Sequence, residues 1–425
     1  MLNAKLPQSK DTDTNMQQNA YIAGVGMTSF GKHQDRTLKS LTQEAVGIAL
    51  KDAGLEAREL EAAYFGTAAT AVTVGQVMVP GQVALREMGI GRIPVINVEN
   101  ACASAATAFQ QACTMVTAGL YDVVLAIGSE KLYCEDKQKT FSVFTGAVDF
   151  ESFDSVSADL YKRIEAAGIK TDAGGAGSNR SLFMDIYAAM ALGHMRDYGT
   201  TREDFAAVSA KTSFHGSLNP KAQFKDVLSV DDVLGAREIS YPLTLAMCSP
   251  IGDGSAAAVI VSEKMAKRLG LANMVRVKCS VLRSGWDIDE NEPGVTEVVA
   301  KEAYEQSGVG PEDLDVVELH DASSPAELMY YETLGLCAKG EGARFIGEGH
   351  SKLGGKTPVN PSGGLLRKGH PVGATGLAQI AELTDQLRGR ADKRQVEGAR
   401  IALAENGGGY IGSDAAAMVI TVLEK

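Results

Sequence analysis

The plan of this chain is repeated in ALKDAGLEARELEAAYFG (residues 49–66) and AYEQSGVGPEDLDVVELH (residues 303–320), which lie 254 residues apart. Each stretch predicts a helix that ends at glycine, then a short acidic turn and an apolar strand. A second pair, AGLYDVVLAIG (118–128) and EGARIALAENG (397–407), repeats a glycine, a strand and a glycine turn. We interpret the chain as two similar halves; the alternative is the generic resemblance that any two α/β segments share.

The rest of the chain alternates β-branched runs with longer helical stretches, which is the pattern of an α/β fold. A helix is expected from the N-cap Thr37 to Lys51, with Gly54 ending it. We expect the two halves at 21–270 and 271–425, and an insertion in the first half near 130–240, where segments such as Gly174–Gly177 break the alternation. Residues 1–20 are polar and predict a disordered lead-in. The predicted strands are Tyr21–Val25, Val95–Val98, Val123–Ile127, Ala257–Val261, Val275–Val281, Val316–Leu319, Ile401–Ala404 and Met418–Val422.

Composition excludes several classes of protein. The chain has 425 residues, 45% hydrophobic and 22% charged, as in a soluble protein with a large core. A net charge of -12 argues against a general nucleic-acid or anionic-membrane surface, although a local basic rim for phosphates is compatible with it. No stretch approaches the ~18 apolar residues of a membrane span, and no signal peptide is recognisable. The six cysteines form no C-x-x-C pair, so we expect reduced thiols, no bound metal and a cytoplasmic location.

Cys102 follows the apolar strand PVINV and begins an Ala-rich helix that is expected to run to Ala118. Unpaired N–H groups at a helix start favour a thiolate, so the position suits a nucleophile whose pKa falls to ~3.5–7.5. The alternative is a buried thiol packed at a strand–helix junction.

Two histidines stand beside features that suit a ligand site. His370 lies in GGLLRKGHPVGATG (363–376), whose five glycines let a ligand or a second backbone come close. This string lacks the pattern of a phosphate P-loop. His320 ends the strand VVEL, and Asp321 is expected either to orient its ring or to precede a helix that starts at Ser323 or Ser324.

Two glycine-containing turns complete the pattern. AENGGGYIG (404–412) ends a strand in three consecutive glycines, which suit either an oxyanion hole or a tight turn. SPIGDGSAAAVIV (249–261) predicts a glycine turn that leads into a buried strand.

These segments together resemble the thiolase superfamily: NACASA around Cys102, LHDASSPAELMYYETLGL, NPSGGLLRKGHPVGATG, ENGGGYIG and SPIGDGSAAAVIV. The His-Asp pair at 320–321 is similar to that of the sterol-carrier-protein-2-type thiolases. The resemblance implies a five-layered αβαβα sandwich, built from two duplicated halves with an inserted loop domain. It also implies a homodimer that pairs through edge strands of the N-terminal halves.

The resemblance assigns roles to the candidate residues. Cys102 would take the acyl group from a 3-oxoacyl-CoA, His370 would be the base, and His320 would hold a water and polarise the thioester or keto oxygen. The backbone N–H groups of Cys102 and Gly407 would form the second oxyanion hole. Coenzyme A would be a co-substrate, with no permanently bound cofactor. Three residues are candidates for binding CoA: Ser255, Arg367 and Lys368.

One catalytic residue of thiolases is missing. Thiolases use a second cysteine as acid/base, either before the terminal glycines or just after His-Asp, and these positions are Glu405 and Ala322 in this chain. General acid–base catalysis contributes ~10² to 10⁴ in rate, so either another group replaces this cysteine or the reaction has changed. Glu405 is the nearest candidate by sequence; its alternative role is a structural anchor of the glycine turn.

Three functions are compatible with these patterns. The first is a CoA-dependent thiolase of a degradation pathway, with a bulky or aromatic acyl-CoA such as benzoylsuccinyl-CoA as one candidate substrate. The second is a retro-aldol lyase on a CoA thioester of the steroid side-chain type, which the missing cysteine favours. The third is a non-catalytic acyl-CoA or lipid carrier, which leaves three catalytic residues without a task. A separate small subunit with a zinc ribbon and an OB-like fold is a further expected partner, whereas nucleic acids and membranes are not.

Overall fold

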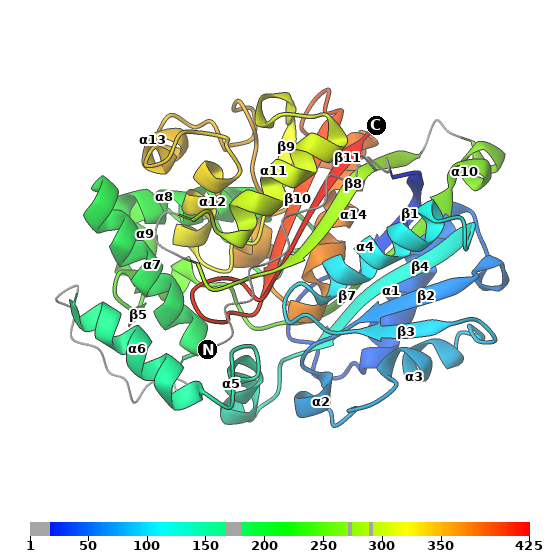
Figure 1. Ribbon diagram of the computed structural model, residues 1–425, viewed down its shortest axis with the longest axis horizontal. Coiled ribbons are helices and arrows are strands. Elements are labelled where there is room, and N and C mark those ends of the chain that lie inside the picture. Colours follow the sequence, from blue (N-terminus) through cyan, green and yellow to red (C-terminus); the bar gives the residue numbers. More distant parts are fainter. Residues whose placement is uncertain (1–17, 167–179, 271–273, 289–291) are drawn as a thin grey trace, which may run out of the picture.

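The computed structural model describes residues 18–166, 180–270, 274–288 and 292–425, and its centre is a nine-stranded sheet (Figure 1). The strands follow the order β3-β2-β4-β7-β1-β8-β11-β10-β9 across the sheet. Their bounds are β1 (Ala20–Met27), β2 (Ala62–Gly66), β3 (Val95–Val98), β4 (Val123–Lys131), β7 (Asp253–Ser262), β8 (Val275–Ser284), β9 (Val316–Glu318), β10 (Ile401–Gly408) and β11 (Ala417–Glu424).

The order of the strands is symmetric about its middle. On one side β2 and β4 run parallel and β7 is antiparallel to β4; on the other, β9 and β10 run parallel and β11 is antiparallel to β10. The two sides meet where Ala20–Ile22 of β1 pairs with Val275–Val277 of β8. In the described part of the chain, only the edge strand β3 lacks a counterpart. A duplicated chain produces this symmetry.

The repeated sequence forms the same unit twice. Thr37 caps α1 (Leu38–Ala53), which ends at Gly54 with φ 65° and is followed by a 3-10 turn and β2. α11 (Val295–Ser307) ends at Gly308 with φ 66° and is followed by a 3-10 turn and β9. Both glycines adopt the left-handed conformation that a residue without a β-carbon takes readily. The predicted duplication is thus confirmed, and so are the N-cap Thr37 and the terminating Gly54 predicted for α1.

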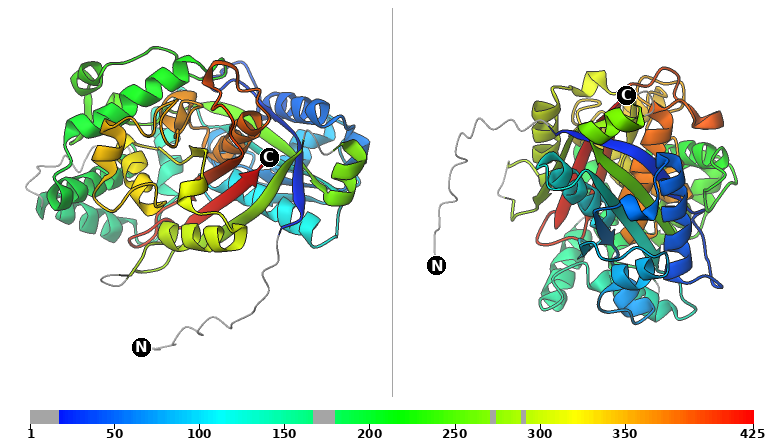
Figure 2. Two further views of the ribbon diagram at one scale, coloured as in Figure 1. Left: turned by 90° about the horizontal axis from the view of Figure 1, so that it is seen from above. Right: turned by 90° about the vertical axis from the view of Figure 1, so that its right-hand side faces the viewer.

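Helices cover both faces of each side of the sheet, which gives five layers (Figure 2). α1 and α3 (Pro80–Arg86) pack on the outer face of the N-terminal strands. α11 packs on the outer face of the C-terminal strands, beside α12 (Ser324–Thr333). α4 (Ser104–Thr117) and α14 (Thr375–Leu387) lie between the two sides and contact each other. The expected αβαβα sandwich is confirmed.

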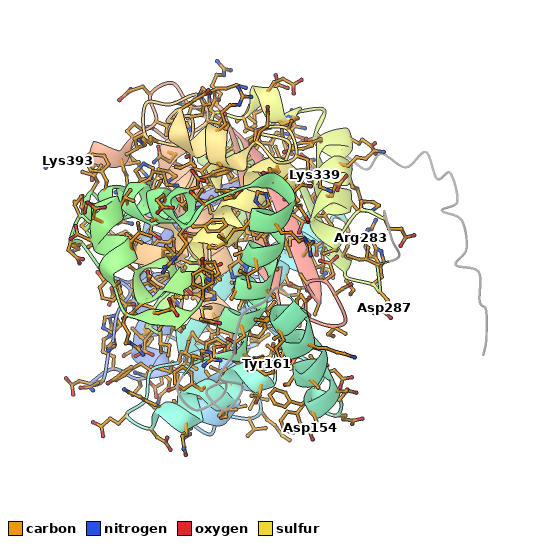
Figure 3. The ribbon with its side chains drawn as sticks, turned by 90° about the vertical axis from the view of Figure 1, so that its left-hand side faces the viewer. Asp154, Tyr161, Arg283, Asp287, Lys339 and Lys393 are labelled. Carbon is orange, nitrogen blue, oxygen red and sulfur yellow. The ribbon has the colours of Figure 1, made fainter. Side chains whose placement is uncertain are left out.

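The chain leaves the sheet between β4 and β7 and forms a mostly helical insertion, at the left of Figure 1. The Tyr161 hydroxyl, labelled in Figure 3, donates to Asp185 at 3.0 Å and ties α6 to α7. The predicted break at Gly174–Gly177 lies outside the described residues. The insertion contains α5 (Lys137–Thr145), α6 (Phe153–Ala166), α7 (Leu182–Tyr198), α8 (Arg202–Ser217), α9 (Val230–Gly235), β5 (Glu238–Ser240) and β6 (Leu243–Thr244).

Two element boundaries differ from those expected. The helix after Cys102 starts at Ser104, and β10 continues beyond Ala404 to Gly408, so that only Gly409 of the three glycines lies in the turn. None of the helices in the described ranges has the length and apolar character that crossing a bilayer requires. Other short elements in the described ranges are α2 (Thr70–Thr73), α10 (Glu263–Leu269), α13 (Gly342–Gly347), a π-turn (Gly364–Lys368) and 3-10 turns at Leu245–Met247, Val372–Ala374 and Asp392–Arg394.

Candidate active site

Cys102 lies in a tight turn between β3 and α4. Ala101 has φ 48°, a left-handed conformation that is unfavourable for a residue with a β-carbon and is typical of functional turns. Ser104 holds the turn: its hydroxyl donates to the Ala101 carbonyl at 2.7 Å and accepts the Asn100 N–H at 2.9 Å. A β-carbon on Gly408 would lie 2.2 Å from the Asn100 oxygen, so only glycine lets β10 approach this turn.

His370 lies in the loop that precedes α14. Its Nδ1 is 2.7 Å from the Thr375 hydroxyl, which itself donates to the Pro371 carbonyl at 3.3 Å. When Nδ1 carries the ring proton, it donates to the Thr375 hydroxyl oxygen, whose own proton then goes to the Pro371 carbonyl. This tautomer leaves a lone pair on His370 Nε2, as a base requires.

His320 follows the end of β9, and its backbone N–H donates to Glu405 Oε2 at 2.8 Å. Its Nε2 is buried and has no hydrogen-bond partner among the described residues, so it is available to a ligand. Asp321 does not orient this ring. Its carboxylate accepts the Leu365 and Leu366 N–H groups, at 2.6 and 3.4 Å, and so holds the π-turn before His370.

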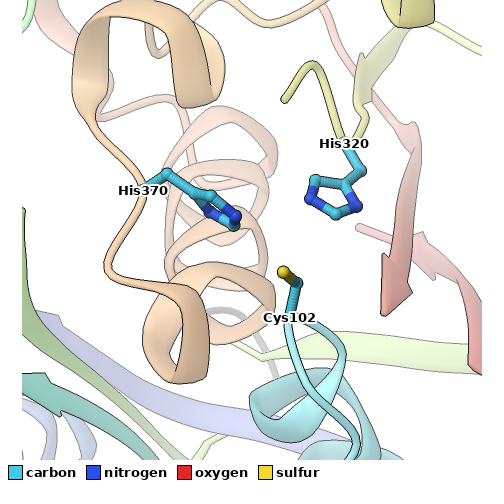
Figure 4. A group of neighbouring side chains, drawn as sticks. All are labelled: Cys102, His320 and His370. Atoms are coloured by element: carbon cyan, nitrogen blue, oxygen red, sulfur yellow. The ribbon is translucent and has the colours of Figure 1, made fainter. Parts of the chain in front are cut away.

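The three candidate catalytic side chains meet at one point (Figure 4). The Cys102 Sγ and one ring nitrogen each of His320 and His370 lie within 4.8 Å of one another, and the ring centroids are 5.2 Å apart. All three border a cavity of 430 Å³. In the described part of the chain, these three side chains form the one group of His, Cys, Asp and Glu residues close enough to share a metal ion. One thiol and two imidazoles are ligand types that would suit Zn²⁺.

Burial sets the charge state of this group. It raises the pKa of Cys102 to about 12, and the nearby Glu130 and Glu99 charges add to the shift. Burial also lowers the pKa of His320 to about 4 and that of His370 well below its usual value. The expected depressed thiol pKa is therefore wrong, because desolvation outweighs the helix end. The resting site holds a neutral thiol beside two neutral imidazoles.

Glu130, at the end of β4, was not recognisable from the sequence. Its buried carboxylate accepts four hydrogen bonds of 2.9 to 3.0 Å: from the Thr67 hydroxyl and from the Ala68, Ala69 and Gly373 N–H groups. It therefore joins the N-terminal strands to the loop that carries His370. Burial raises the pKa of Glu130 to about 7.

Glu405 lies behind the cavity wall. Its Oε2 accepts the His320 N–H, and its buried Oε1 has no partner among the described residues. Burial raises the pKa of Glu405 to about 8, so it is largely protonated at neutral pH. Gly407, two residues further along β10, borders the cavity, as does Ala322.

Three predicted CoA contacts are wrong. Ser255 is fully buried in β7, where its hydroxyl donates to the Gly128 carbonyl at 3.1 Å. Arg367 is 6% exposed and pairs with Asp226 at 2.8 Å. Lys368 is fully buried, and its Nζ lies 3.0 Å from Glu318 Oε2. All three are committed to internal contacts. Ser249, from the same segment as Ser255, borders the cavity instead.

Aromatic and thioether side chains, most of them from the insertion, form part of the cavity wall. These side chains carry no sequence motif, and only the fold brings them to Cys102. They are Phe141 and Phe144 of α5 and Phe183, Met184, Tyr187 and Met190 of α7, with Tyr330 of α12 and Tyr410 opposite.

Two family models match successive parts of the chain. The model of the thiolase N-terminal domain matches residues 20–235, and that of the thiolase C-terminal domain-like family matches residues 291–421. The chain is 38% identical over 403 residues to the benzoylsuccinyl-CoA thiolase subunit BbsB of Thauera aromatica, covering 93% of this chain and 96% of that protein. It is 37% identical over 398 residues to Homo sapiens sterol carrier protein 2, covering 91% of this chain and 69% of that protein.

A solved structure agrees with these matches. The Ltp2-ChsH2(DUF35) aldolase superposes with a TM-score of 0.76 at 26% identity, over 96% of this chain and 98% of that chain.

Proposed function

Because the chain belongs to the thiolase superfamily, in its sterol-carrier-protein-2-type branch, we propose that it transfers an acyl group between Cys102 and coenzyme A. The reaction would cleave a 3-oxoacyl-CoA into two acyl-CoAs or run the reverse condensation. One observation carries this proposal. Cys102, His320 and His370 come from three distant segments and meet within 4.8 Å at a cavity.

The charge state supports a general-base mechanism. The His370 Nε2 lone pair takes the thiol proton as Cys102 attacks the keto carbon. Cleavage of the adjacent C–C bond then leaves the acyl group on sulfur and an enolate on the departing acyl-CoA. His320 Nε2, a lone-pair acceptor on the neutral ring, would hold a water that donates to this oxygen, and the N–H groups of Cys102 and Gly407 would hold the oxygen of the acyl group. Each such donor is worth about 2.7–4 kcal/mol when charge develops on the oxygen.

Glu405 has the contacts of an anchor rather than of a proton donor to substrate. It fixes the His320 backbone and is absent from the residues that border the cavity in the described part of the chain. We therefore assign it the positioning of His320, which is neither the predicted acid/base role nor the predicted anchoring of the glycine turn.

The cavity wall supports a bulky or aromatic acyl group. Phe144 and Phe183 have ring centroids 6.4 Å apart, and Met184 and Met190 border the same space. Aromatic and thioether side chains pack well on an aromatic ring. The benzoylsuccinyl-CoA thiolase subunit, whose name states such a substrate, is similar along nearly its whole length.

The test is the mass of the Cys102 peptide after incubation with straight, branched and aromatic acyl-CoAs and 3-oxoacyl-CoAs. We expect an acyl adduct on this peptide, strongest with an aromatic donor and absent from the Cys102→Ser variant. No adduct with any donor, with and without a co-purified small subunit, would refute the acyltransferase.

A retro-aldol lyase is the second candidate. Ala322 stands where a thiolase has its acid/base cysteine, and an aldolase complex shares the fold at 26% identity. A lyase needs no acyl-enzyme, so it would release product from a β-hydroxyacyl-CoA without labelling Cys102. A carrier, the third reading, would bind acyl-CoA and do neither.

The surface supports a homodimer. The edge strand β3 has an unpaired outer side in the described structure, and Ile96 on it is 37% exposed. Exposed apolar side chains continue beside it at Val72, Val74, Val77, Met78, Val79 and Val83. An open edge next to an apolar surface favours pairing with a second copy.

Two further assignments complete the proposal. A separate small subunit would assist CoA binding, as the words subunit and DUF35 in the names of two similar proteins suggest. The enzyme would work in the cytoplasm of its host, because all six cysteines are free.

A further inference from the structure

In the proposed cleavage, no residue has yet been assigned to donate a proton to the departing enolate. The departing enolate must gain a proton at carbon, and the incoming CoA thiol must lose one. Thiolases assign both transfers to the second cysteine, but a methyl group stands at position 322 and borders the cavity. A replacement must also border the cavity, and it must carry a proton that protein contacts leave available.

Cys248 borders the cavity but does not meet the second condition. Its thiol donates to the Thr244 carbonyl at 3.3 Å. Asp414 also borders the cavity, but its carboxylate accepts the Val295 N–H at 2.6 Å.

Two tyrosines meet both conditions. Tyr187 of α7 and Tyr330 of α12 border the cavity, and neither hydroxyl has a hydrogen-bond partner among the described residues. The rest of each ring packs against the core cluster of the C-terminal half, which fixes where the hydroxyl can point.

The charged neighbours distinguish the two hydroxyls. Burial raises the pKa of Tyr187, and Cys102, Glu405 and Asp321 would add to this shift when ionised, with Cys102 the strongest of the three. For Tyr330 the order after burial is Glu405, Tyr187, Asp414 and last Cys102. Tyr187 lies in the middle of the face of α7 that borders this cavity, one turn from Met184 and one turn from Met190. The neighbours of Tyr330, Met329 and Thr333, border a second cavity as well, so Tyr187 is the better placed of the two.

We propose that the Tyr187 hydroxyl replaces the second catalytic cysteine, donating a proton to the enolate carbon and later accepting the proton of the CoA thiol. The inference rests on the proposed function of the same site.

The proton balance closes over one turnover. In the first half, His370 takes the Cys102 proton, the C–C bond breaks, the Tyr187 O–H bond breaks and a C–H bond forms on the departing acyl-CoA. In the second half, the Tyr187 phenolate takes the proton of the CoA thiol. The resulting thiolate attacks the acyl-Cys102 carbonyl, and the released Cys102 sulfur recovers its proton from His370.

The test uses two readouts on the full-length enzyme. The first is acylation of Cys102 by an activated aryl thioester, whose thiolate leaves without needing a proton, so that neither proposed role of Tyr187 is used. The second is incorporation of deuterium from D₂O at the α-carbon of an acyl-CoA added to the acylated enzyme, measured by mass spectrometry. Only the second requires proton transfer to and from carbon.

Tyr187→Phe removes the hydroxyl and little else. We expect it to acylate within about tenfold of the wild-type rate and to lose ~10² to 10⁴ of the deuterium exchange, the usual contribution of general acid–base catalysis. Tyr198→Phe is the matched control on the same helix, since Tyr198 is 42% exposed outside this cavity, and both of its rates should stay at the wild-type level.

The outcomes separate this inference from the proposed function. Wild-type exchange in Tyr187→Phe would overturn the inference, and so would a wild-type enzyme that forms the adduct without exchanging deuterium. Loss of exchange in Tyr330→Phe but not in Tyr187→Phe would move the role to Tyr330 and also overturn it. Absence of the adduct in the wild type would refute the proposed function instead.

Discussion

At Cys102, burial and the nearby helix end act on the thiol in opposite directions. The helix start favours a thiolate, but the sulfur lies in a buried site beside the Glu130 and Glu99 carboxylates, and burial prevails. The nucleophile therefore depends on His370 as a base, and the lowered pKa of His370 keeps that base neutral.

This charge state predicts the pH dependence of acylation. His370 has its pKa lowered well below 6.5, so it stays neutral as the pH falls from 8 to 6. The rate of Cys102 acylation should therefore stay constant over that window in Glu130→Gln, which removes the neighbouring carboxyl whose own pKa of about 7 lies inside it. If the base were a histidine of ordinary pKa, the acylation rate would fall about fourfold at pH 6. Single-turnover acylation followed by mass measures this directly, and an apparent pKa near 6.5 would contradict the account.

Glu405 predicts a pH-dependent stability. Its pKa is about 8 in the folded protein, above the ordinary carboxyl value of 4.5. The folded state therefore binds the extra proton, and stability is lost as the pH rises from 4.5 through 8. Glu405→Gln keeps an acceptor for the His320 N–H and removes this loss. We expect the free energy of unfolding of the variant, relative to that of the wild type, to rise by on the order of a few kcal/mol when the pH is raised from 5 to 8.5.

Urea unfolding at the two pH values measures this gain, with the exposed Glu397→Gln as the matched control. Equal differences at both pH values would show that Glu405 is already ionised in the folded protein.

Single residues show where sequence reasoning stops. The motifs identified Cys102, His320 and His370, because each stands at the end of a strand or before a helix within a distinctive string. The same reasoning misplaced Arg367 and Lys368, since a basic residue beside a glycine loop looks solvated until its partners Asp226 and Glu318 are known. Tyr187 carried no signal, because its helix meets Cys102 only in the folded chain.

At the scale of elements, the site depends on a close crossing of α4 and α14. The turn with Cys102 precedes the first helix and the loop with His370 precedes the second, so the two helices occupy corresponding places in the two halves. Gly376 makes the crossing possible. A β-carbon there would lie 2.6 Å from the Ala106 nitrogen and 2.8 Å from the Asn406 side-chain oxygen.

Gly376→Ala should therefore destabilise the protein and slow acylation. Overpacking against backbone typically costs about 1–3 kcal/mol, and here the strain displaces the loop with His370. Gly47→Ala in the exposed interior of α1 meets nothing within 4 Å and should stabilise by about 0.5–1 kcal/mol. Thermal unfolding and acylation rates of both variants test this. An unaffected Gly376→Ala would show that the helices can separate without disturbing the site.

The elements themselves were largely predictable. Strand periodicity located the sheet strands, and Gly54 and Thr37 fixed the first helix correctly. The helix after Cys102 starts at Ser104 rather than at Cys102, because Ala101 adopts a left-handed conformation that an alanine does not predict. β10 runs on to Gly408 because pairing with β11 overrides the turn preference of glycine.

At the scale of the whole molecule, duplication explains why the site lies where it does. The sheet is symmetric about the β1–β8 pair, and Cys102 from one half meets His320 and His370 from the other. The insertion between β4 and β7 then supplies the cavity wall. Sequence could predict the two halves but not this wall, because the apolar residues of an insertion show no period that distinguishes a cavity from a core.

The proposed dimer is testable at this scale. Ile96→Lys places a charge on the exposed edge strand β3 of the N-terminal half, so the protein should become monomeric while each chain stays folded. Light scattering after gel filtration measures the mass, with Ile48→Lys on the outer face of α1 as the control, since Ile48 is 39% exposed. A dimer that survives Ile96→Lys would place the interface elsewhere.

Transfer of the acyl group from isolated acyl-enzyme to free CoA tests the central claim most directly. The enzyme is acylated, freed of donor and mixed with CoA, and both the Cys102 peptide mass and the new acyl-CoA are followed in time. The account predicts stoichiometric transfer from Cys102 that is at least as fast as turnover. An adduct that persists in the presence of CoA, or that lies on another residue, would contradict it.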